Sequence, residues 1–165
     1  MFRHGLKFKN FFRVDHMRKG ILIGRIWVPN GVTNEGKDDM LGVQFDAVTQ
    51  KPNWYIGLID NSGFSALDPT DTLASHAGWT ENTDYDEVNR VEWNPDAPAS
   101  QAITNATPRD FTMNASVTIN GVLIASVNTG TSGILWATGS FTGGAIPVAD
   151  DDVLSIVYTV ELQDP

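Results

Sequence analysis

The residues best suited to nucleophilic catalysis are Ser75 and His76, with Asp71 four positions before the serine. A serine nucleophile needs a histidine base within reach of its hydroxyl, and that histidine needs a carboxylate to orient it. Adjacent residues on a helix point about 100° apart, so this serine and this histidine are poorly placed to form such a pair. We therefore expect a capped helix with a polar face here, and no enzyme activity.

The acidic residues and histidines do not follow a metal-binding pattern. The acidic run 150–152 lacks the alternating ligands and the mid-loop glycine of a calcium-binding EF-hand. His4, His16 and His76 lie far apart and do not form a His-Glu-x-x-His motif. We interpret the acids as solvated turn residues, and expect no metal and no cofactor.

The sequence contains no phosphate-binding or dinucleotide-binding glycine fingerprint. Four tryptophans would stack on sugars if they were exposed, namely Trp54, Trp79, Trp93 and Trp136. Buried tryptophans are the commoner case in a small β domain, so packing is the first interpretation and glycan binding an alternative.

The length and composition are those of one folded domain. The chain has 165 residues, 41% of them hydrophobic, and no cysteine. The missing cysteines exclude a disulfide scaffold, a thiolate metal site and a cysteine nucleophile. No apolar stretch approaches the roughly 18 residues of a membrane helix. The first residues lack the apolar run and small-residue cleavage site of a secretory signal.

The charges divide the chain into two parts. Residues 1–30 carry seven lysines and arginines against Asp15 alone, whereas residues 31–165 carry four against nineteen acids. An acidic body repels nucleic acid and anionic membranes, so neither is an expected partner. A basic, aromatic arm is suited to an acidic protein surface, including that of another subunit. We therefore predict an arm at 1–30 and an acidic body at 31–165.

The arm is expected to be extended, because apolar and charged residues alternate through 6–14. Residues 21–28 are rich in β-branched side chains, end at a turn and are typical of a strand. The alternative is that both segments form an ordinary first hairpin of the body. The predicted inter-subunit contacts of the arm are Arg3, Lys7, Phe8, Lys9, Phe11, Phe12 and Arg13.

The body is predicted to be an antiparallel β-sandwich, either immunoglobulin-like or jelly-roll-like. Strands are predicted at 54–60, 135–141 and 153–162, and a strand at 111–119 is expected to return at 122–127 through a turn at Asn120-Gly121. Short helices are predicted at 33–45 and 68–79. The predicted fold class is therefore mainly β, with one or two short helices and an extended N-terminal arm.

Four blocks of the body resemble small virion structural proteins of tailed bacteriophages. They lie at 32–36, 54–60, 71–81 and 152–160, and the block at 71–81 is the most specific. The resemblance covers roughly residues 31–165 and implies a capsid decoration (cement) protein, or else a tail or fibre component. The motif positions that it marks are Asp71, His76, Trp79 and Glu81.

This resemblance and the charge pattern lead to one expectation about function. The protein is expected on the capsid surface of a virion, after synthesis in the cytoplasm of the bacterial host. There it would form a homotrimer that bridges neighbouring major capsid proteins and stabilises the head. The arm would make the contacts with neighbouring subunits. Deleting residues 1–19 should then weaken assembly and leave the body folded. The alternative is a tail or head-fibre component that binds a host receptor or glycan through exposed aromatic residues.

Overall fold

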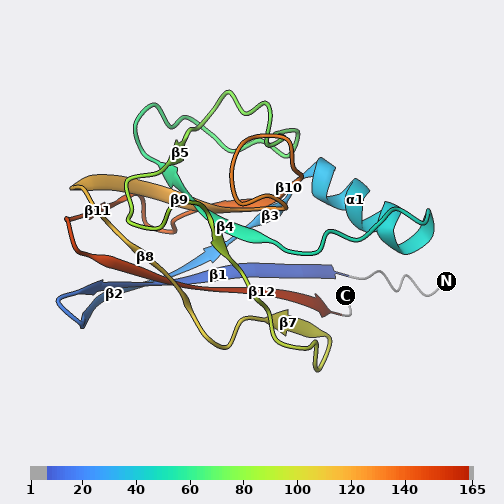
Figure 1. The fold of residues 1–165 in the computed structure, drawn as a ribbon, viewed down its shortest axis with the longest axis horizontal. Coiled ribbons are helices and arrows are strands. Elements are labelled where there is room, and N and C mark those ends of the chain that lie inside the picture. The colour runs from blue at the N-terminus through green and yellow to red at the C-terminus, as the bar shows by residue number, and fades with distance from the viewer. Residues whose placement is uncertain (1–6, 164–165) are drawn as a thin grey trace.

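The computed structural model describes residues 7–163 and shows two antiparallel β-sheets packed against each other (Figure 1). Sheet A has five strands in the order β2-β1-β12-β7, and β8 also pairs with β12. Sheet B has seven strands in the order β3-β10-β9-β4-β5, with β11 paired to β9 and β6 paired to β4. The predicted mainly β, antiparallel sandwich is confirmed.

The strands differ widely in length, and the longest are in sheet A. Sheet A comprises β1 (Lys7–Arg18), β2 (Ile21–Pro29), β7 (Ala102–Thr104), β8 (Arg109–Thr112) and β12 (Val153–Gln163). Sheet B comprises β3 (Gly31–Val32), β4 (Tyr55–Asp60), β5 (Glu81–Asn82), β6 (Val91–Glu92), β9 (Val117–Ala125), β10 (Leu135–Ser140) and β11 (Ile146–Val148). The predicted strands at 21–28, 54–60, 135–141 and 153–162 are therefore present.

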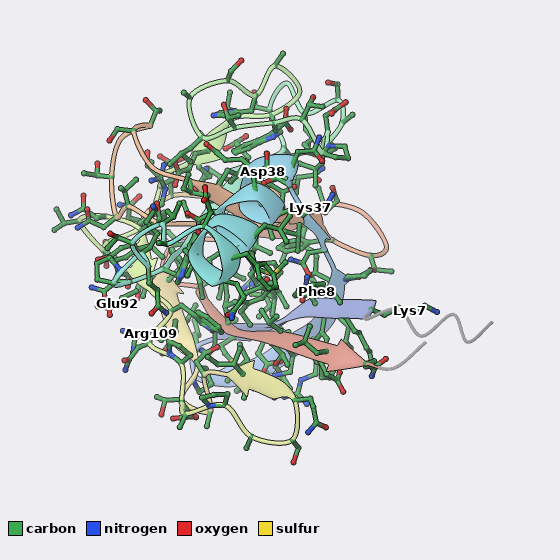
Figure 2. The ribbon with its side chains drawn as sticks, turned by 90° about the vertical axis from the view of Figure 1, so that its right-hand side faces the viewer. Lys7, Phe8, Lys37, Asp38, Glu92 and Arg109 are labelled. Carbon is green, nitrogen blue, oxygen red and sulfur yellow. The ribbon has the colours of Figure 1, made fainter. Side chains whose placement is uncertain are left out.

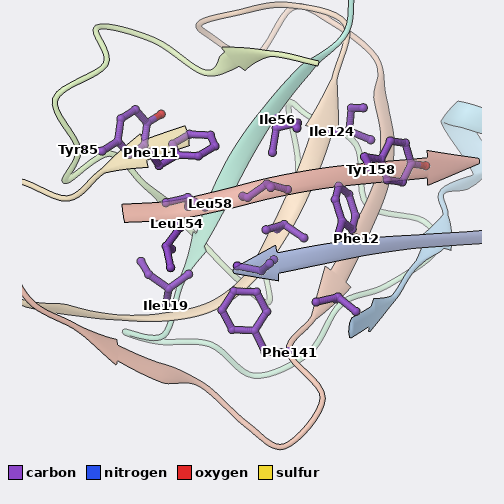
Figure 3. Packing of buried hydrophobic residues seen from close by; sticks show 14 of the residues in the cluster. Phe12, Ile56, Leu58, Tyr85, Phe111, Ile119, Ile124, Phe141, Leu154 and Tyr158 are labelled. Carbon is purple, nitrogen blue, oxygen red and sulfur yellow. The ribbon is translucent and has the colours of Figure 1, made fainter. Parts of the chain in front are cut away.

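The main core lies between the two sheets (Figure 3). Phe12 of β1 and Tyr158 of β12 face Ile56 and Leu58 of β4, and all four side chains are completely buried. Burying one such side chain contributes about 1.5–3 kcal/mol. These contacts between distant parts of the sequence hold the sheets together.

Residues 7–29 belong to the sandwich and do not form a separate arm. Strand β1 pairs with β12 from Lys7 to Met17 on one side and with β2 on the other. This is the hairpin alternative, and its cause is the alternation that buries Phe12 and Val14 in the core. Residues 1–6, the rest of the predicted arm, lie outside the described residues. Deleting residues 1–19 would remove a strand from the interior of sheet A, so it cannot leave the body intact.

Sheet B is also covered on its outer side, by the loop 61–80. Leu73 and Trp79 of this loop pack against Ile59 and Leu123 in a second apolar cluster. The predicted helix at 68–79 is wrong, because the chain turns back at a bridge between Thr72 and Ser75. Burial of two large apolar side chains against the sheet outweighs a weak local preference for helix. It also explains why β4 is apolar on both faces.

The predicted turn at Asn120-Gly121 is wrong as well. Both residues lie inside the continuous strand β9, which pairs with β10 on one side and β4 on the other. The predicted strand at 111–119 is divided between the sheets, because Phe111 belongs to β8 in sheet A whereas Val117 and Ile119 belong to β9 in sheet B. Gly121 permits close strand packing here, because a Cβ atom at this position would meet the carbonyl oxygen of Gly139.

We expect Gly121→Ala to destabilise the protein by about 2 kcal/mol, since the added methyl group overpacks an interior strand. Urea unfolding followed by circular dichroism measures the change. Gly31→Ala is the matched control, because a Cβ atom at Gly31 meets nothing within 4 Å. Equal midpoints for the two variants would show that β9 and β10 are not packed as described.

The helix α1 (Asn34–Phe45) confirms the prediction for 33–45. Thr33 is its N-cap, and the threonine hydroxyl accepts a hydrogen bond from the backbone N–H of Gly36 at 3.0 Å. Gly36 is its one fully buried residue, pressed against the backbone of Trp136 in β10. The helix thus rests on one end of the sandwich (Figure 1). Within residues 7–163, no helix is long and apolar enough to span a membrane.

Candidate functional site: a basic and aromatic face on sheet A

Strand alternation divides the predicted contact residues between two faces of sheet A. Phe12 points inward and stacks on Tyr158, with ring centroids 4.3 Å apart. The prediction of an inter-subunit contact is therefore wrong for Phe12, which is completely buried in the core of its own chain. Phe8 points to the same side as Phe12 but lies at the open end of the sandwich, where it is 41% exposed. Lys7 is exposed, and Arg3 lies outside the described residues.

Lys9, Phe11 and Arg13 occupy the outer face of the same strand. Pairing with β2 places Trp27 directly opposite Arg13, and the Phe11 and Trp27 rings lie 5.5 Å apart. Trp27 is 54% exposed, so much of its indole faces solvent. We define the basic aromatic face as Lys9, Phe11, Arg13, Arg25 and Trp27.

Sequence reasoning did not identify Arg25 and Trp27 as site residues. The signal was present, because these two residues share one parity of the strand at 21–28. The assignment also needed the register of the β1–β2 hairpin. A register shift between His16 and Met17 determines that register, and the sequence does not reveal it.

Asp15 holds the two arginines of the face in place. Its carboxylate accepts two hydrogen bonds from Arg25, at 2.6 and 2.9 Å, and lies 3.5 Å from Nε of Arg13. The hydrogen bond from Arg25 lowers the pKa of Asp15, and the charge of Arg13 acts in the same direction. One carboxylate shared between two guanidinium groups leaves a net positive charge and keeps both groups oriented.

Lys9 lies on the same face, where the carboxylate of Glu161 offsets its charge. Its ammonium lies 3.7 Å from a carboxylate oxygen of Glu161 and 5.9 Å from the ring centroid of Phe11. An exposed pair of this kind contributes only about 0–1 kcal/mol to stability. Tryptophan and arginine are among the residue types enriched at the energetic centres of protein interfaces.

The edge next to this face is apolar and open. Strand β2 pairs only with β1 among the described residues, and Ile21, Leu22 and Ile23 are 67%, 45% and 49% exposed. The loop after β10 contacts β2 near its C-terminal end. There the Thr142 hydroxyl donates a hydrogen bond to the Trp27 carbonyl oxygen at 2.9 Å. Charge and proline protect such edges, and Arg25 and Pro29 supply them in the second half of β2. The first half, 21–23, has neither and is suited to a contact surface.

The motif positions Asp71, His76 and Trp79 come together, but away from this face. Trp79 is 2% exposed, and its indole N–H donates to the Asp71 carboxylate at 2.9 Å. The His76 ring stacks on the indole at 3.8 Å, and His76 Nδ1 lies 3.0 Å from the Trp79 carbonyl oxygen. These contacts fix the loop 61–80 against sheet B. His76 therefore contacts Trp79 through both its ring face and its Nδ1 atom.

Glu81, the fourth motif position, has a similar supporting role. It accepts two hydrogen bonds of 2.7 Å from Arg90, whose guanidinium also donates to the carbonyl oxygens of Val127 and Gly130. This network ties β5 to the loop after β9. The four motif residues therefore stabilise loops, and sequence alone did not separate that role from a contact role.

Two of the tryptophans considered for glycan binding are unsuited to it. Trp79 and Trp93 are 2% and 5% exposed, so a sugar cannot stack on either ring. Trp93 instead donates its indole N–H to the Asn105 side-chain oxygen at 2.8 Å. Trp27 is the exposed tryptophan of the face described above.

The acidic run at 150–152 is only partly the solvated turn that we predicted. Asp150 is exposed, but Asp152 is 1% exposed and receives two hydrogen bonds from Arg18, at 2.7 and 2.8 Å. The His16 ring lies 2.7 Å from the same carboxylate. Throughout residues 7–163, no three histidine or acidic side chains gather in a way that would hold a metal ion.

Comparison with models of known protein families finds no match, and no curated protein sequence matches this chain.

Proposed function

We propose that this protein is a structural protein of a bacteriophage virion, a decoration protein that binds the outside of the capsid and bridges neighbouring major capsid proteins. The observation that carries the proposal is the basic aromatic face beside the open edge of β2. A positive, aromatic surface next to an unpaired strand fits an acidic, extended segment of a partner protein.

The distribution of charge supports a protein partner. Residues 7–29 contain six lysines and arginines and only Asp15 as an acid, whereas residues 31–165 contain nineteen acids and four lysines and arginines. The acidic body is repelled by nucleic acid. The hairpin β1–β2 is therefore the part of the described chain that attracts an acidic neighbour, which on a shell is the capsid protein or a second copy of this chain.

The resemblance of the blocks at 54–60 and 71–81 to virion structural proteins supports the same location. In the proposed assembly three copies surround a local threefold axis, and each uses its hairpin edge to contact a neighbour. Repetition of one weak contact around the axis raises the overall affinity for the shell.

The test of the proposed location is quantitative mass spectrometry of purified virions, with the major capsid protein as the internal standard. We expect a copy number equal to that of the capsid protein or to a simple fraction of it, such as one third. Absence from the particle would overturn the proposal.

A glycan-binding fibre component is the second candidate, and the exposure of Trp27 is the observation that favours it. An indole that is 54% exposed on a sheet face can stack on a sugar ring. A copy number of a few dozen or fewer, with glycan binding abolished by Trp27→Ala, would favour this candidate over decoration.

A further inference from the structure

An apolar pocket opens between the two sheets at the end of the sandwich that carries α1. Its volume is about 410 Å³. Tyr158 and Ile124 lie deep in the pocket, where both are almost completely buried, and Phe8 lies at the opening. Figure 2 looks onto this end of the molecule, with Phe8 near the middle and α1 above it. This pocket lies on the opposite side of sheet A from the basic aromatic face.

A second hollow of about 490 Å³ continues from this pocket beneath α1. Five apolar residues line both spaces, namely Phe8, Met40, Trp54, Trp136 and Leu162. The two hollows therefore adjoin each other between the inner side of sheet A and the helix, and we call them together the channel. The helix contributes Met40 to the lining of both hollows and Leu41, Val43 and Phe45 to the second.

In the inner part of the wall, two indole N–H groups already have partners inside the protein. The indole N–H of Trp136 donates to the Tyr158 hydroxyl at 2.8 Å, and that of Trp93 donates to Asn105. In the outer part, Lys51 and Asp39 lie 3.3 Å apart, so their charges offset each other. A sugar or another polar ligand would leave its hydroxyl groups without partners here, at a large cost.

We propose that this channel binds a linear aliphatic chain, namely the acyl chain of an amphiphile. A flexible hydrocarbon chain fits a long, narrow space and makes dispersion contacts with its aromatic walls. Water is a poor alternative, because a buried water molecule needs two to four polar partners. The polar head of the amphiphile would lie at the outer end, near the side chains of Gln44 and Gln50. This inference is independent of the proposed virion location.

The test uses the purified full-length protein and the fluorescent apolar probe 1-N-phenylnaphthylamine. We expect saturable binding of the probe and its competitive displacement by oleate and by monoolein. Displacement by both ligands supports recognition of the chain alone, and displacement by oleate only supports an added contribution of the carboxylate. Probe binding that does not saturate, or that neither ligand displaces, would overturn the proposal.

A matched pair of variants on β12 locates the site. Val160 lines the channel, whereas Val157 lies on the opposite face of the same strand. We expect Val160→Phe to weaken binding of the probe and of oleate at least tenfold, and Val157→Phe to leave both unchanged. Met40→Trp on the helix narrows the channel without altering a strand, and covers the case in which Val160→Phe does not fold.

Unchanged binding by folded Val160→Phe and Met40→Trp would place the ligand elsewhere and refute the assignment. If the purified protein binds no acyl chain but Val160→Phe lowers its copy number in virions, the occupant is an apolar side chain of the shell, and the proposal is likewise refuted. Failure of the virion proposal alone would leave the fluorescence results unaffected.

Discussion

Replacing Asp152 by alanine is expected to lower the free energy of unfolding by about 3 kcal/mol, because it breaks a buried network and leaves polar groups unpaired. The carboxylate accepts hydrogen bonds from Arg18 and from the backbone N–H of Ala149, and it contacts His16. These partners come from both ends of the chain, so the network joins the β1–β2 hairpin to the turn before β12. Urea unfolding of the two proteins measures the difference.

Asp150→Ala is the matched control for this substitution. Asp150 lies two residues away in the same acidic run, but its side chain is exposed. Its replacement is expected to change stability by less than about 0.5 kcal/mol. Similar losses in the two variants would mean that the turn as a whole, and not the buried carboxylate, stabilises this end of the sandwich.

The same network predicts how stability depends on pH. The Arg18 hydrogen bonds hold the pKa of Asp152 well below its usual value, against the opposing effect of burial, and the Ala149 N–H and His16 act with Arg18. A lowered pKa means that the stabilisation is fully present above the unfolded-state pKa of about 4 and is lost as the pH falls toward the folded-state pKa.

The stability difference between the protein and Asp152→Asn should therefore shrink as the pH falls below about 4. Unfolding curves at a series of pH values measure it. A difference that persists unchanged to pH 2 would assign the acid sensitivity to other carboxylates.

Trp27→Ala is expected to weaken binding to the shell roughly a hundredfold, which corresponds to about 2.7 kcal/mol, if the basic aromatic face is the contact surface. The indole is more than half exposed and packs on Phe11, with Arg13 directly opposite on β1 and Arg25 two residues earlier on β2. Its loss would remove the largest apolar contact of the face while leaving the core unchanged. Binding of purified protein to particles that lack it, measured by co-sedimentation, gives the affinity.

Two further measurements make this result interpretable. Val88→Ala is the control, because Val88 is 94% exposed and lies in the segment between β5 and β6, away from the face. Thermal unfolding checks that Trp27→Ala remains folded. Binding of the unaltered protein should also weaken with salt, since the face is positively charged. Full binding by Trp27→Ala at every salt concentration would assign the contact to another surface.

Much of the fold followed from local patterns in the sequence. The dense apolar strand at 54–60, the alternating strand at 153–162 and the capped helix after Thr33 are all present. Each depends on interactions within a few residues, such as side-chain alternation or a threonine that caps a helix. The sequence also determined that charge is segregated, because a count of residues needs no coordinates.

Other features depended on residues that are far apart in the chain. Asn120-Gly121 is a strong local signal for a turn, yet it lies inside β9, where Gly121 pairs with Ile59 of β4 and with Ser140 of β10. Similarly, Trp79 packs the loop 61–80 against sheet B, and the loop is not helical although the sequence of residues 68–79 favours a helix. The local conformational preference of a residue contributes only about 1 kcal/mol. The burial of a large apolar side chain contributes more.

The candidate site shows the same division. The sequence determined that the N-terminal strands are basic and aromatic, but their alternation alone did not tell which face would be buried. Pairing of β1 with β12 decided that Phe12 enters the core and that Lys9, Phe11 and Arg13 remain outside. Pairing with β2 then placed Trp27 among them. The sequence determines which residue types are present. Which residues become neighbours across a sheet depends on how the whole chain buries its apolar surface.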